Sequence, residues 1–378
     1  MSTVGAIENV AALVNAKRDL ARLTVRLGAV ASNYRLCRRL AGPAAVAGVV
    51  KAESYGLGMA PIARTLSDAG CDTFFVARVE EGVALRPIVP EARIFVLDGA
   101  RGESVAALLA HRLTPVLNSL DEIALWQSAA KDAHSGFDAA IHVDTGMSRL
   151  GLPPTELSRL AAEANTRLAH LRLVLVMSHL AGADDAATAM NARQLARFRE
   201  ALAMLPPAPA SFASTGGVLL GKDYAFDLVR PGIGLYGGNP QAGTKNPFAV
   251  AAVLTGRILQ LRRVDKGESV GYGASFVAAR NTALATVALG YADGLMRAIG
   301  NRGEGAIAGQ RAPVAGRVSM DLVTLDVTDL PDLRAGAEVE FFGDTISLEE
   351  IAAAAGTANY EILTGIGPRV PRHYVEAA

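Results

Sequence analysis

Two kinds of hydrophobic pattern alternate through the first two thirds of the chain. Short, nearly continuous apolar runs are typical of strands that are buried on both faces of a parallel sheet. Between them, apolar residues return every three or four positions, which predicts helices, among them 61–69, 78–86, 155–165 and 191–205. The runs that predict strands are 44–50, 72–77, 93–97, 114–117, 138–143, 172–177, 210–213 and 227–230.

Eight such strand–helix units in about 220 residues match the number that builds a (β/α)8 barrel of the TIM type. A doubly wound open sheet is the alternative arrangement of the same units. We favour the barrel, and we expect it to occupy residues 20–240.

The pattern changes after Asn239. A turn-rich segment, 239–243, leads into alternating runs separated by turn pairs such as Lys266-Gly267 and Gly309-Gln310. These runs are 253–264, 282–289, 306–318, 322–327 and 338–342, and helical patterns follow at 347–355 and 360–364. We therefore predict a mostly antiparallel β domain over residues 241–378, with residues 1–19 as a candidate segment to pack on it.

Charge and composition exclude several classes of function. Lys plus Arg and Asp plus Glu both number 37, so no basic face for nucleic acid is indicated. The two cysteines, Cys37 and Cys71, lack metal-ligand spacing and suit a reducing compartment. The start of the chain lacks the pattern of an export signal, and no apolar stretch is long enough to span a membrane. We expect a cytoplasmic protein without a metal site.

Lys51 directly follows the first predicted barrel strand. Active sites of barrels lie at the carboxyl ends of the strands. A lysine that loses hydration there has a lowered pKa and becomes nucleophilic toward a carbonyl group. A solvated lysine that opens a loop is the equally balanced alternative for this feature alone.

Two small-residue loops follow the last two predicted strands. They are Ser214-Thr215-Gly216-Gly217 and Arg230-Pro231-Gly232-Ile233-Gly234. Backbone N–H groups, hydroxyl groups and a helix start can bind an anion, and barrels frequently bind phosphate at these two loops. Two ordinary glycine turns are the alternative, but their position together with Lys51 favours the phosphate site.

Two further rim segments carry polar chemistry. Arg149 lies in the loop 144–151 after the fifth strand, where a guanidinium could hold a carboxylate through two hydrogen bonds. A surface salt bridge is as good an explanation from this segment alone. His179 ends the sixth strand, and its rim position favours a role over a purely structural one.

Three segments of the β domain have little meaning by themselves. Tyr272 stands in Gly-Tyr-Gly, which is more typical of a hairpin tip than of a catalytic group. Tyr291 stands in Gly-Tyr-Ala-Asp-Gly, and residues 316–321 read Gly-Arg-Val-Ser-Met-Asp.

Together these segments resemble alanine racemase, a family of fold-type III pyridoxal-phosphate enzymes. The resemblance runs in order from about Leu23 to Arg372, and it rests on Lys-Ala-x-x-Tyr-Gly from Lys51, on Asp-Thr-Gly-Met-x-Arg-Leu-Gly from Asp144, and on the other segments above. It implies a PLP-binding barrel and a β domain in a homodimer whose active sites are shared between subunits. It further implies the interconversion of L- and D-alanine, with D-alanine used for peptidoglycan or alanine used as a nutrient.

The resemblance also implies residue roles. Lys51 would form the internal aldimine and act as one base, and the partner subunit's Tyr272 would be the opposite base. Arg149 and the backbone of Met320 would hold the substrate carboxylate. Cofactor contacts would come from Tyr55, His179, Ser214, Thr215, Arg230, Gly232, Ile233 and Tyr291. The corridor by which substrate enters would be lined by Asp184, Arg297 and Arg317.

These roles suit the chemistry. Pyridoxal phosphate acidifies the substrate Cα–H because its ring spreads the resulting charge. Inversion of the carbon then needs a proton removed on one face and delivered on the other, by two positioned acid–base groups. Arg230 facing the ring nitrogen would keep that atom unprotonated and disfavour transamination.

Several positions depart from the common pattern, among them Leu57, Pro368 and the pair Ser214-Thr215. Many members of the family carry a lysine modified to a carbamate where this chain has His142. We therefore expect no carbamylation here, and what orients Arg149 is left open.

Other functions remain to be separated. A racemase of broader specificity, acting on serine as well as alanine, has the same fold, but such relatives tend to be exported. A fold-type III decarboxylase would favour an acidic residue in place of Arg230. A non-catalytic pyridoxal-phosphate carrier is the alternative of another class, but it would lack a second domain.

Overall fold

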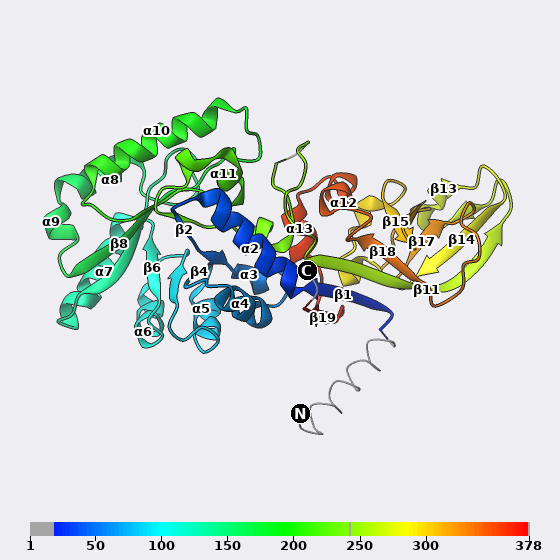
Figure 1. The fold of residues 1–378 in the computed structure, drawn as a ribbon, viewed down its shortest axis with the longest axis horizontal. Helices are drawn as coiled ribbons and strands as arrows, with labels where there is room; N and C mark the ends of the chain where they lie inside the picture. Colours follow the sequence, from blue (N-terminus) through cyan, green and yellow to red (C-terminus); the bar gives the residue numbers. More distant parts are fainter. Residues whose placement is uncertain (1–18, 242, 377–378) are drawn as a thin grey trace, which may run out of the picture. The chain divides into compact units, whose positions relative to one another are not determined.

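The computed structural model describes residues 19–241 and 243–376. Backbone contacts divide these residues into two compact units, one formed by residues 29–249 and the other by residues up to 28 together with residues from 250 onward. Figure 1 labels the elements of both units along the blue-to-red course of the chain.

The first unit is a barrel of parallel strands. Strands β3 to β9 form one parallel sheet in sequence order, and β10 pairs in parallel with β2. Asp227 N donates to Ala210 O at 3.0 Å and Arg230 N donates to Ala213 O at 2.8 Å, so β10 also lies beside β9 and closes the ring. The strands are β2 Ala45–Val46, β3 Gly48–Val49, β4 Thr73–Val76, β5 Arg93–Val96, β6 Thr114–Leu117, β7 Phe137–His142, β8 Leu171–Met177, β9 Ala210–Ser211 and β10 Leu228–Val229. Each predicted strand overlaps one of these, with β2 and β3 interrupting the first, and the predicted barrel is confirmed.

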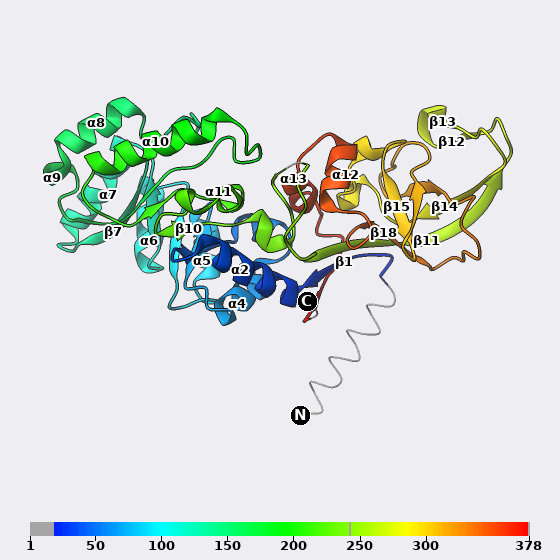
Figure 2. The same ribbon diagram turned by 45° about the horizontal axis from the view of Figure 1, so that its top comes forward.

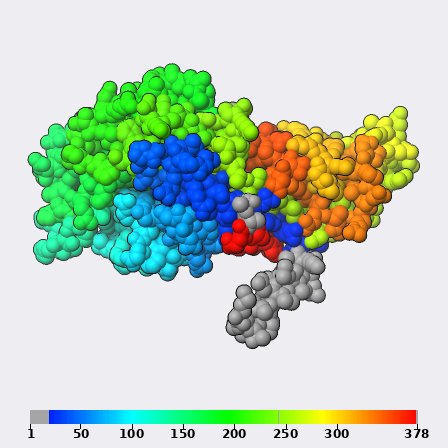
Figure 3. Space-filling model, viewed as in Figure 1, coloured from blue at the N-terminus to red at the C-terminus, as the bar shows by residue number. Residues whose placement is uncertain are grey.

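Helices surround these strands, as Figures 1 and 2 show. The residues buried on α4 are Met59, Ile62, Ala63 and Leu66, whose spacing places them on one helical face. Asn33 on α2 donates to Leu235 O at 3.3 Å, and the blue surface of α2 accordingly lies against green atoms of later segments in Figure 3. The helices are α2 Leu27–Ala41, α3 Lys51–Tyr55, α4 Met59–Asp68, α5 Val79–Leu85, α6 Val105–Ala110, α7 Leu120–Asp132, α8 Pro154–Ala162, α9 Ala164–Arg167, α10 Ala189–Met204 and α11 Thr215–Leu220.

The second unit is mostly antiparallel. Its main sheet runs β16-β15-β18-β11-β1-β19, and β14 joins β11 to β17. The long strand β11 changes partners near a bulge between Ile258 and Gln260, because its early part pairs with β1 and β18 and its later part with β14. The strands are β1 Ala21–Arg26, β11 Ala252–Val264, β12 Ser269–Val270, β13 Phe276–Val277, β14 Thr282–Val287, β15 Glu304–Ile307, β16 Gln310–Pro313, β17 Val323–Asp326, β18 Glu338–Phe342 and β19 Arg372–Val375.

Two details of this unit differ from the pattern-based expectation. The run 306–318 holds two strands joined by a tight turn, in which Ala308 and Gly309 have positive φ values of 49° and 80°. The pair β1–β19 is parallel, whereas the other pairs of this unit are antiparallel. The expected helices are present as α12 Leu348–Ala355 and α13 Asn359–Thr364.

The division into units differs from the expected boundaries of 20–240 and 241–378. Strand β1 belongs with the β unit because it pairs with β11 and β19. Residues up to 249 belong with the barrel, where Asn33 exchanges two hydrogen bonds with the backbone of Ala249. The segment 1–19, expected to pack on the β domain, lies outside the described residues except for Asp19, which pairs with His373 at 2.6 Å.

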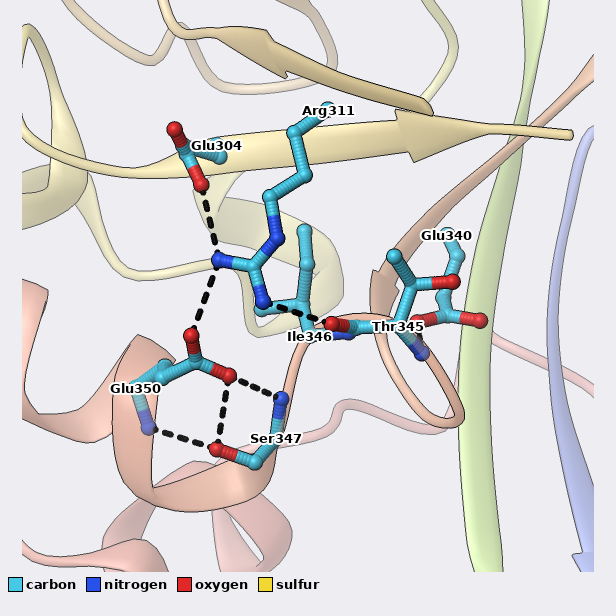
Figure 4. Close-up of polar contacts among 7 residues, drawn as sticks. All are labelled: Glu304, Arg311, Glu340, Thr345, Ile346, Ser347 and Glu350. Atoms are coloured by element: carbon cyan, nitrogen blue, oxygen red, sulfur yellow. Dashed lines mark hydrogen bonds and ion pairs between the residues drawn. The ribbon is translucent and has the colours of Figure 1, made fainter. Parts of the chain in front are cut away.

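Arg311 joins three parts of the β unit, as Figure 4 shows. Its Nη1 lies 3.0 Å from Glu304 Oε2 and 2.8 Å from Glu350 Oε1, and its Nη2 donates to Thr345 O at 2.7 Å. Ser347 and Glu350 form a reciprocal cap at the start of α12. This network ties the β15–β16 hairpin to α12.

The longest helix of the described residues is α10 with 16 residues. None of the described helices has the length and apolar character needed to cross a membrane.

Candidate active site

Lys51 stands at the carboxyl end of the first barrel strand, immediately before an unusual turn. The next four residues, Ala52 to Tyr55, have φ values between 51° and 59°. This is a left-handed turn, which costs L-residues roughly 1–2 kcal/mol each. Such strain persists only where surrounding contacts fix the backbone, so we expect contacts that hold this turn in place.

Three hydrogen bonds hold the backbone of that turn. Ala52 N donates to Glu81 Oε1 at 2.6 Å, Gly56 N donates to Ala52 O at 2.8 Å, and Met59 N donates to Glu53 Oε2 at 3.0 Å. Glu81 is a residue that the sequence reasoning missed. Its position three residues into the helix after the next rim strand is the signal that could have identified it.

The environment of Lys51 favours a neutral amine. Burial lowers the pKa of Lys51, and the positive charge of Arg149 lowers it further. The negative charges of Glu81 and Asp98 act in the opposite direction, but burial prevails. The direction agrees with the expectation from the sequence, and a neutral amine is the form that attacks an aldehyde.

The two loops after β9 and β10 meet at Thr215. The Thr215 hydroxyl oxygen accepts from Gly232 N at 3.0 Å and from Gly234 N at 3.2 Å. Both acceptor positions are therefore used, and the hydroxyl hydrogen is the group it can offer to a ligand. A Cβ on Gly232 would lie 2.2 Å from the Tyr55 hydroxyl, so Tyr55 rests directly on this loop and only glycine fits.

Ser214 and Ile233 belong to the same corner of the barrel. The backbones of Ser214 and Arg230 pair in an isolated parallel β-bridge, and Ile233 is fully buried at the start of a short 3-10 turn. The helix after Ser214 has only six residues, so the expected contribution of its dipole is small.

Arg230 is a buried guanidinium beside this corner. Its Nη2 donates to Ser178 O at 2.7 Å, its Nη1 donates to the Ser211 hydroxyl, and its Cζ lies 5.7 Å from the centre of the Phe75 ring. Burial lowers its pKa to about 9. Among the described residues no carboxylate pairs with it within the ion-pair distance, so the cation is held by neutral dipoles.

Arg149 lies on a loop that its neighbours hold rigidly. Asp144 Oδ1 accepts from the backbone N–H groups of residues 146, 147 and 148 at 2.9 to 3.1 Å. Gln194 of α10 donates to the Thr145 hydroxyl at 3.1 Å and to His179 O at 2.9 Å, which ties this loop to the end of β8. Arg149 itself is exposed at the end of this braced loop.

Two histidines on the rim are held neutral. Burial is the main cause that lowers the pKa of His142 to about 4 and that of His179 to about 3, and the positive charge of Arg230 adds to both. His142 Nδ1 lies 2.8 Å from Asn118 Oδ1. Since Asn118 Nδ2 donates to Val116 O at 2.8 Å, the oxygen faces the ring, and Nδ1 carries the hydrogen of the neutral imidazole.

The expected residues of the β unit gather around one segment, 316–320. The Arg317 guanidinium lies against Gly273, because a Cβ there would be 3.0 Å from its Nη1. Tyr291 N donates to Ser319 O at 3.0 Å, and the next N–H donates to Met320 O at 2.9 Å. The short turn Arg297–Ile299 leads into Gly300, where a Cβ would lie 3.1 Å from the Arg317 Cα.

Three of these side chains are exposed although they are large and apolar. The exposed fractions are 69% for Tyr272, 54% for Met320 and 42% for Tyr291. Tyr272 occupies a 3-10 turn between two glycines with positive φ. We call Tyr272, Tyr291 and Met320 the exposed cluster.

The structure thus brings most expected residues together within their own units. In the barrel unit, Asp184 is exposed on the loop after β8. No group of three or more metal-ligating side chains occurs within residues 19–241 and 243–376.

A closed parallel barrel with a lysine of lowered pKa after its first strand, followed by an antiparallel domain, is the arrangement that the resemblance to fold-type III pyridoxal-phosphate enzymes implies. Comparison with known proteins narrows the class. The model of the alanine racemase N-terminal domain matches residues 25–240, and that of the C-terminal domain matches residues 251–374. The chain belongs to the alanine racemase family.

Individual relatives agree with this assignment. An alanine racemase of Rhodospirillum rubrum is 48% identical, over 94% of this chain and 96% of that protein. A catabolic alanine racemase of Agrobacterium fabrum is 46% identical, over 94% of this chain and 92% of that protein. The crystal structure of alanine racemase from Bartonella henselae, with covalently bound pyridoxal phosphate, is 38% identical with a TM-score of 0.91 and covers 94% of this chain and 100% of that chain.

Proposed function

We propose that this chain is an alanine racemase that interconverts L- and D-alanine with pyridoxal phosphate. The observation that carries the proposal is the desolvated Lys51 at the barrel rim, in a chain whose two halves match both domains of the family. The covalently bound cofactor of the Bartonella henselae relative supports the choice of cofactor.

The residues present fit this cofactor. Lys51 offers an amine for its aldehyde, and the hydroxyl groups of Tyr55 and Thr215, which lie against the loop at Gly232, offer donors for its phosphate. The buried guanidinium of Arg230, held only by neutral dipoles within the described barrel, suits a ring nitrogen that accepts a hydrogen bond. We assign cofactor binding to Lys51, Tyr55, His179, Ser214, Thr215, Arg230, Gly232, Ile233 and Tyr291.

When bound, the cofactor supplies a ring that spreads the charge left after the substrate Cα–H loses its proton. Lys51 Nζ removes or delivers that proton on one face. The Tyr272 hydroxyl does so on the other face, and each positioned group contributes about 10²–10⁴-fold to the rate. Two bases on opposite faces are what inversion of a carbon centre requires.

Binding of alanine depends on a separate group of residues. Arg149 holds the substrate carboxylate from its braced loop, and the backbone of Met320 approaches the same group. Asp184, Arg297 and Arg317 line the corridor by which substrate enters. The rigid loop limits where the carboxylate can sit, which fixes the Cα between the two bases.

Arg230 directs the reaction toward racemisation. A cation that donates to the ring nitrogen keeps this nitrogen unprotonated and weakens its pull on electrons. A carboxylate at this place, which a decarboxylase would favour, is not what the barrel provides. The absence of a lysine at position 142 leads us to propose that no carbamate forms there.

We further propose a homodimer in which each active site takes Lys51 from one subunit and the partner subunit's Tyr272. The exposed cluster supports this proposal, because large exposed apolar side chains commonly mark interaction surfaces. The free, buried cysteines Cys37 and Cys71 support a cytoplasmic location. There the product would serve peptidoglycan synthesis, or the reaction would feed alanine catabolism.

A racemisation assay over a panel of amino acids, with and without added pyridoxal phosphate, tests the proposal. We expect alanine to be racemised fastest, with activity lost on removal of the cofactor and regained on its return. Comparable rates with serine would indicate a racemase of broader specificity. Cofactor binding without racemisation of any amino acid would favour a carrier and contradict the proposal.

A further inference from the structure

Glu81 makes more hydrogen bonds than the start of its own helix requires. Its Oε2 accepts from Ala77 N at 2.7 Å and Arg78 N at 3.0 Å, which is the usual reach of a third helical residue back to the preceding backbone. Its Oε1 accepts from Ala52 N at 2.6 Å. This third bond joins a different strand–loop connection and has no part in capping α5.

The bond to Ala52 falls where the chain is most strained. Ala52 has φ 51° and ψ 53° and is the first of four consecutive left-handed residues, of which none is glycine. Several other backbone bonds of this turn, such as that from Gly56 N to Ala52 O, lie within the 50–59 segment itself. The Glu81 bond instead joins the backbone of the turn to the neighbouring strand–helix pair of the barrel, β4 and α5.

We propose that Glu81 is a positioning residue, whose carboxylate clamps the left-handed turn after Lys51 and thereby aims the Lys51 amine at the aldehyde of pyridoxal phosphate. The consequence for the cofactor rests on the proposed function, whereas the clamp itself rests on the hydrogen bonds that Glu81 accepts. Three N–H donors need both oxygens of a carboxylate. A carboxamide has only one acceptor oxygen, so it cannot serve both the turn and the helix start.

The matched variants are Glu81→Gln and Glu80→Gln. Glu80 precedes Glu81 on the same helix and is exposed, so its replacement removes the same charge from the first turn of α5 without touching the clamp. Each full-length protein is stripped of cofactor and titrated with pyridoxal phosphate. The visible absorbance of the bound form and borohydride trapping at residue 51 are both recorded.

We expect Glu81→Gln to raise the Kd for pyridoxal phosphate about tenfold to a hundredfold, as the loss of hydrogen bonds to a charged acceptor implies. Glu80→Gln should stay within about twofold of the parent, the range of an exposed substitution. Equal Kd values and equal trapping for the two variants would overturn the inference.

Relief of strain gives a readout that general damage to the barrel would not give. Ala52 is exposed, so Ala52→Gly removes little packing and lets the chain adopt a positive φ without penalty. Ala52→Gly should therefore recover part of the lost affinity in the Glu81→Gln background. If it recovers none, Glu81 does not act by holding this turn.

Hydrogen exchange tests the clamp without the cofactor. In the cofactor-free parent protein the Ala52 amide should be protected to a degree similar to the Ala77 amide, and Glu81→Gln should release it about tenfold or more. Rapid exchange of Ala52 in the parent would overturn the clamp even if the variants fail to fold. If the parent binds no pyridoxal phosphate but Ala52 is protected through Glu81, the proposed function fails while the clamp stands.

Discussion

The functional groups at the rim of the barrel and those of the exposed cluster in the β unit differ in how far they are buried. At the rim, partial burial lowers the pKa values of Lys51, His142 and His179, so their charged forms are disfavoured before any ligand binds. In the β unit, Tyr272 stands 69% exposed on a glycine-flanked turn. The barrel side is preorganised, whereas the tyrosine side offers a group that needs another surface to complete it.

The difference also appears in charge. Arg149 and Arg230 place positive charge at the barrel rim, and this charge helps to lower the pKa values of Lys51, His142 and His179, because a further positive charge there would be repelled. A phosphate and a carboxylate would relieve this repulsion. The barrel is thus shaped electrostatically for its anionic ligands before they arrive.

The largest effect should come from removing the amine at the rim. Lys51→Ala should lose the cofactor's visible absorbance and reduce racemisation below detection, because both the attachment point and one base are lost. Measurable racemisation at a substantial fraction of the parent rate would remove the central assignment. Glu80→Gln, an exposed change on the neighbouring helix, serves as the control.

The second effect separates the two bases. Tyr272→Phe should slow proton abstraction from L-alanine by about 10²–10⁴-fold and abstraction from D-alanine much less. Solvent deuterium incorporation into each enantiomer measures the two steps. Because the side chain is exposed, thermal stability should stay within about 0.5 kcal/mol of the parent. Equal losses from both enantiomers would contradict the division of labour.

The third effect tests whether the two regions meet between subunits. Mixing Lys51→Ala with Tyr272→Phe subunits gives heterodimers in which one of two sites has both native groups. Random pairing makes half the dimers mixed, so about a quarter of the parent activity should return. Proven heterodimers without rescue would show that each site is self-contained.

The fourth effect concerns the neutral rim. The pKa of His142 falls from the ordinary value of 6.5 to about 4 in the folded protein. Above a pH of about 6.5, the His142 imidazole is neutral in both the folded and the unfolded protein, so the free energy of unfolding keeps its full value. As the pH falls toward about 4, the unfolded state binds the proton first, and the free energy of unfolding decreases. Across that window the parent should lose at most about 3 kcal/mol more of its unfolding free energy than His142→Gln. Parallel pH profiles in denaturant unfolding would show that the imidazole is not desolvated.

The smallest effect lies on the surface of the β unit. Arg311→Ala removes the contacts to Glu304 and Glu350 that Figure 4 draws, and these three side chains are 41% to 47% exposed. Such exposed pairs contribute less than about 1 kcal/mol, so unfolding should shift little and racemisation not at all. A larger shift would mean that the network holds the β15–β16 hairpin in place.

Much of this contrast can be predicted from the sequence, but for different reasons in the two units. Buried strands are continuous apolar runs, so the barrel strands could be predicted from hydrophobicity. Because active sites of barrels lie at the carboxyl ends of the strands, Lys51 could then be predicted as a site residue. The pairing of β1 with β11 and β19 could not be predicted, because strand partners far apart in sequence leave no local signal.

The site divides in the same way. Lys51 and Arg230 follow strands directly, so their positions were predictable. Glu81 and Asn118 act through backbone groups and a ring nitrogen that only the folded chain brings near them. The left-handed turn after Lys51 was also hidden, because Ala, Glu, Ser and Tyr give no local preference for positive φ.

Borohydride reduction of the cofactor-loaded protein, followed by peptide mapping, shows which lysine carries pyridoxal phosphate. We expect a single phosphopyridoxyl group, on the peptide that contains Lys51. A label on another lysine, or a loaded protein in which Lys51 remains unmodified, would contradict it.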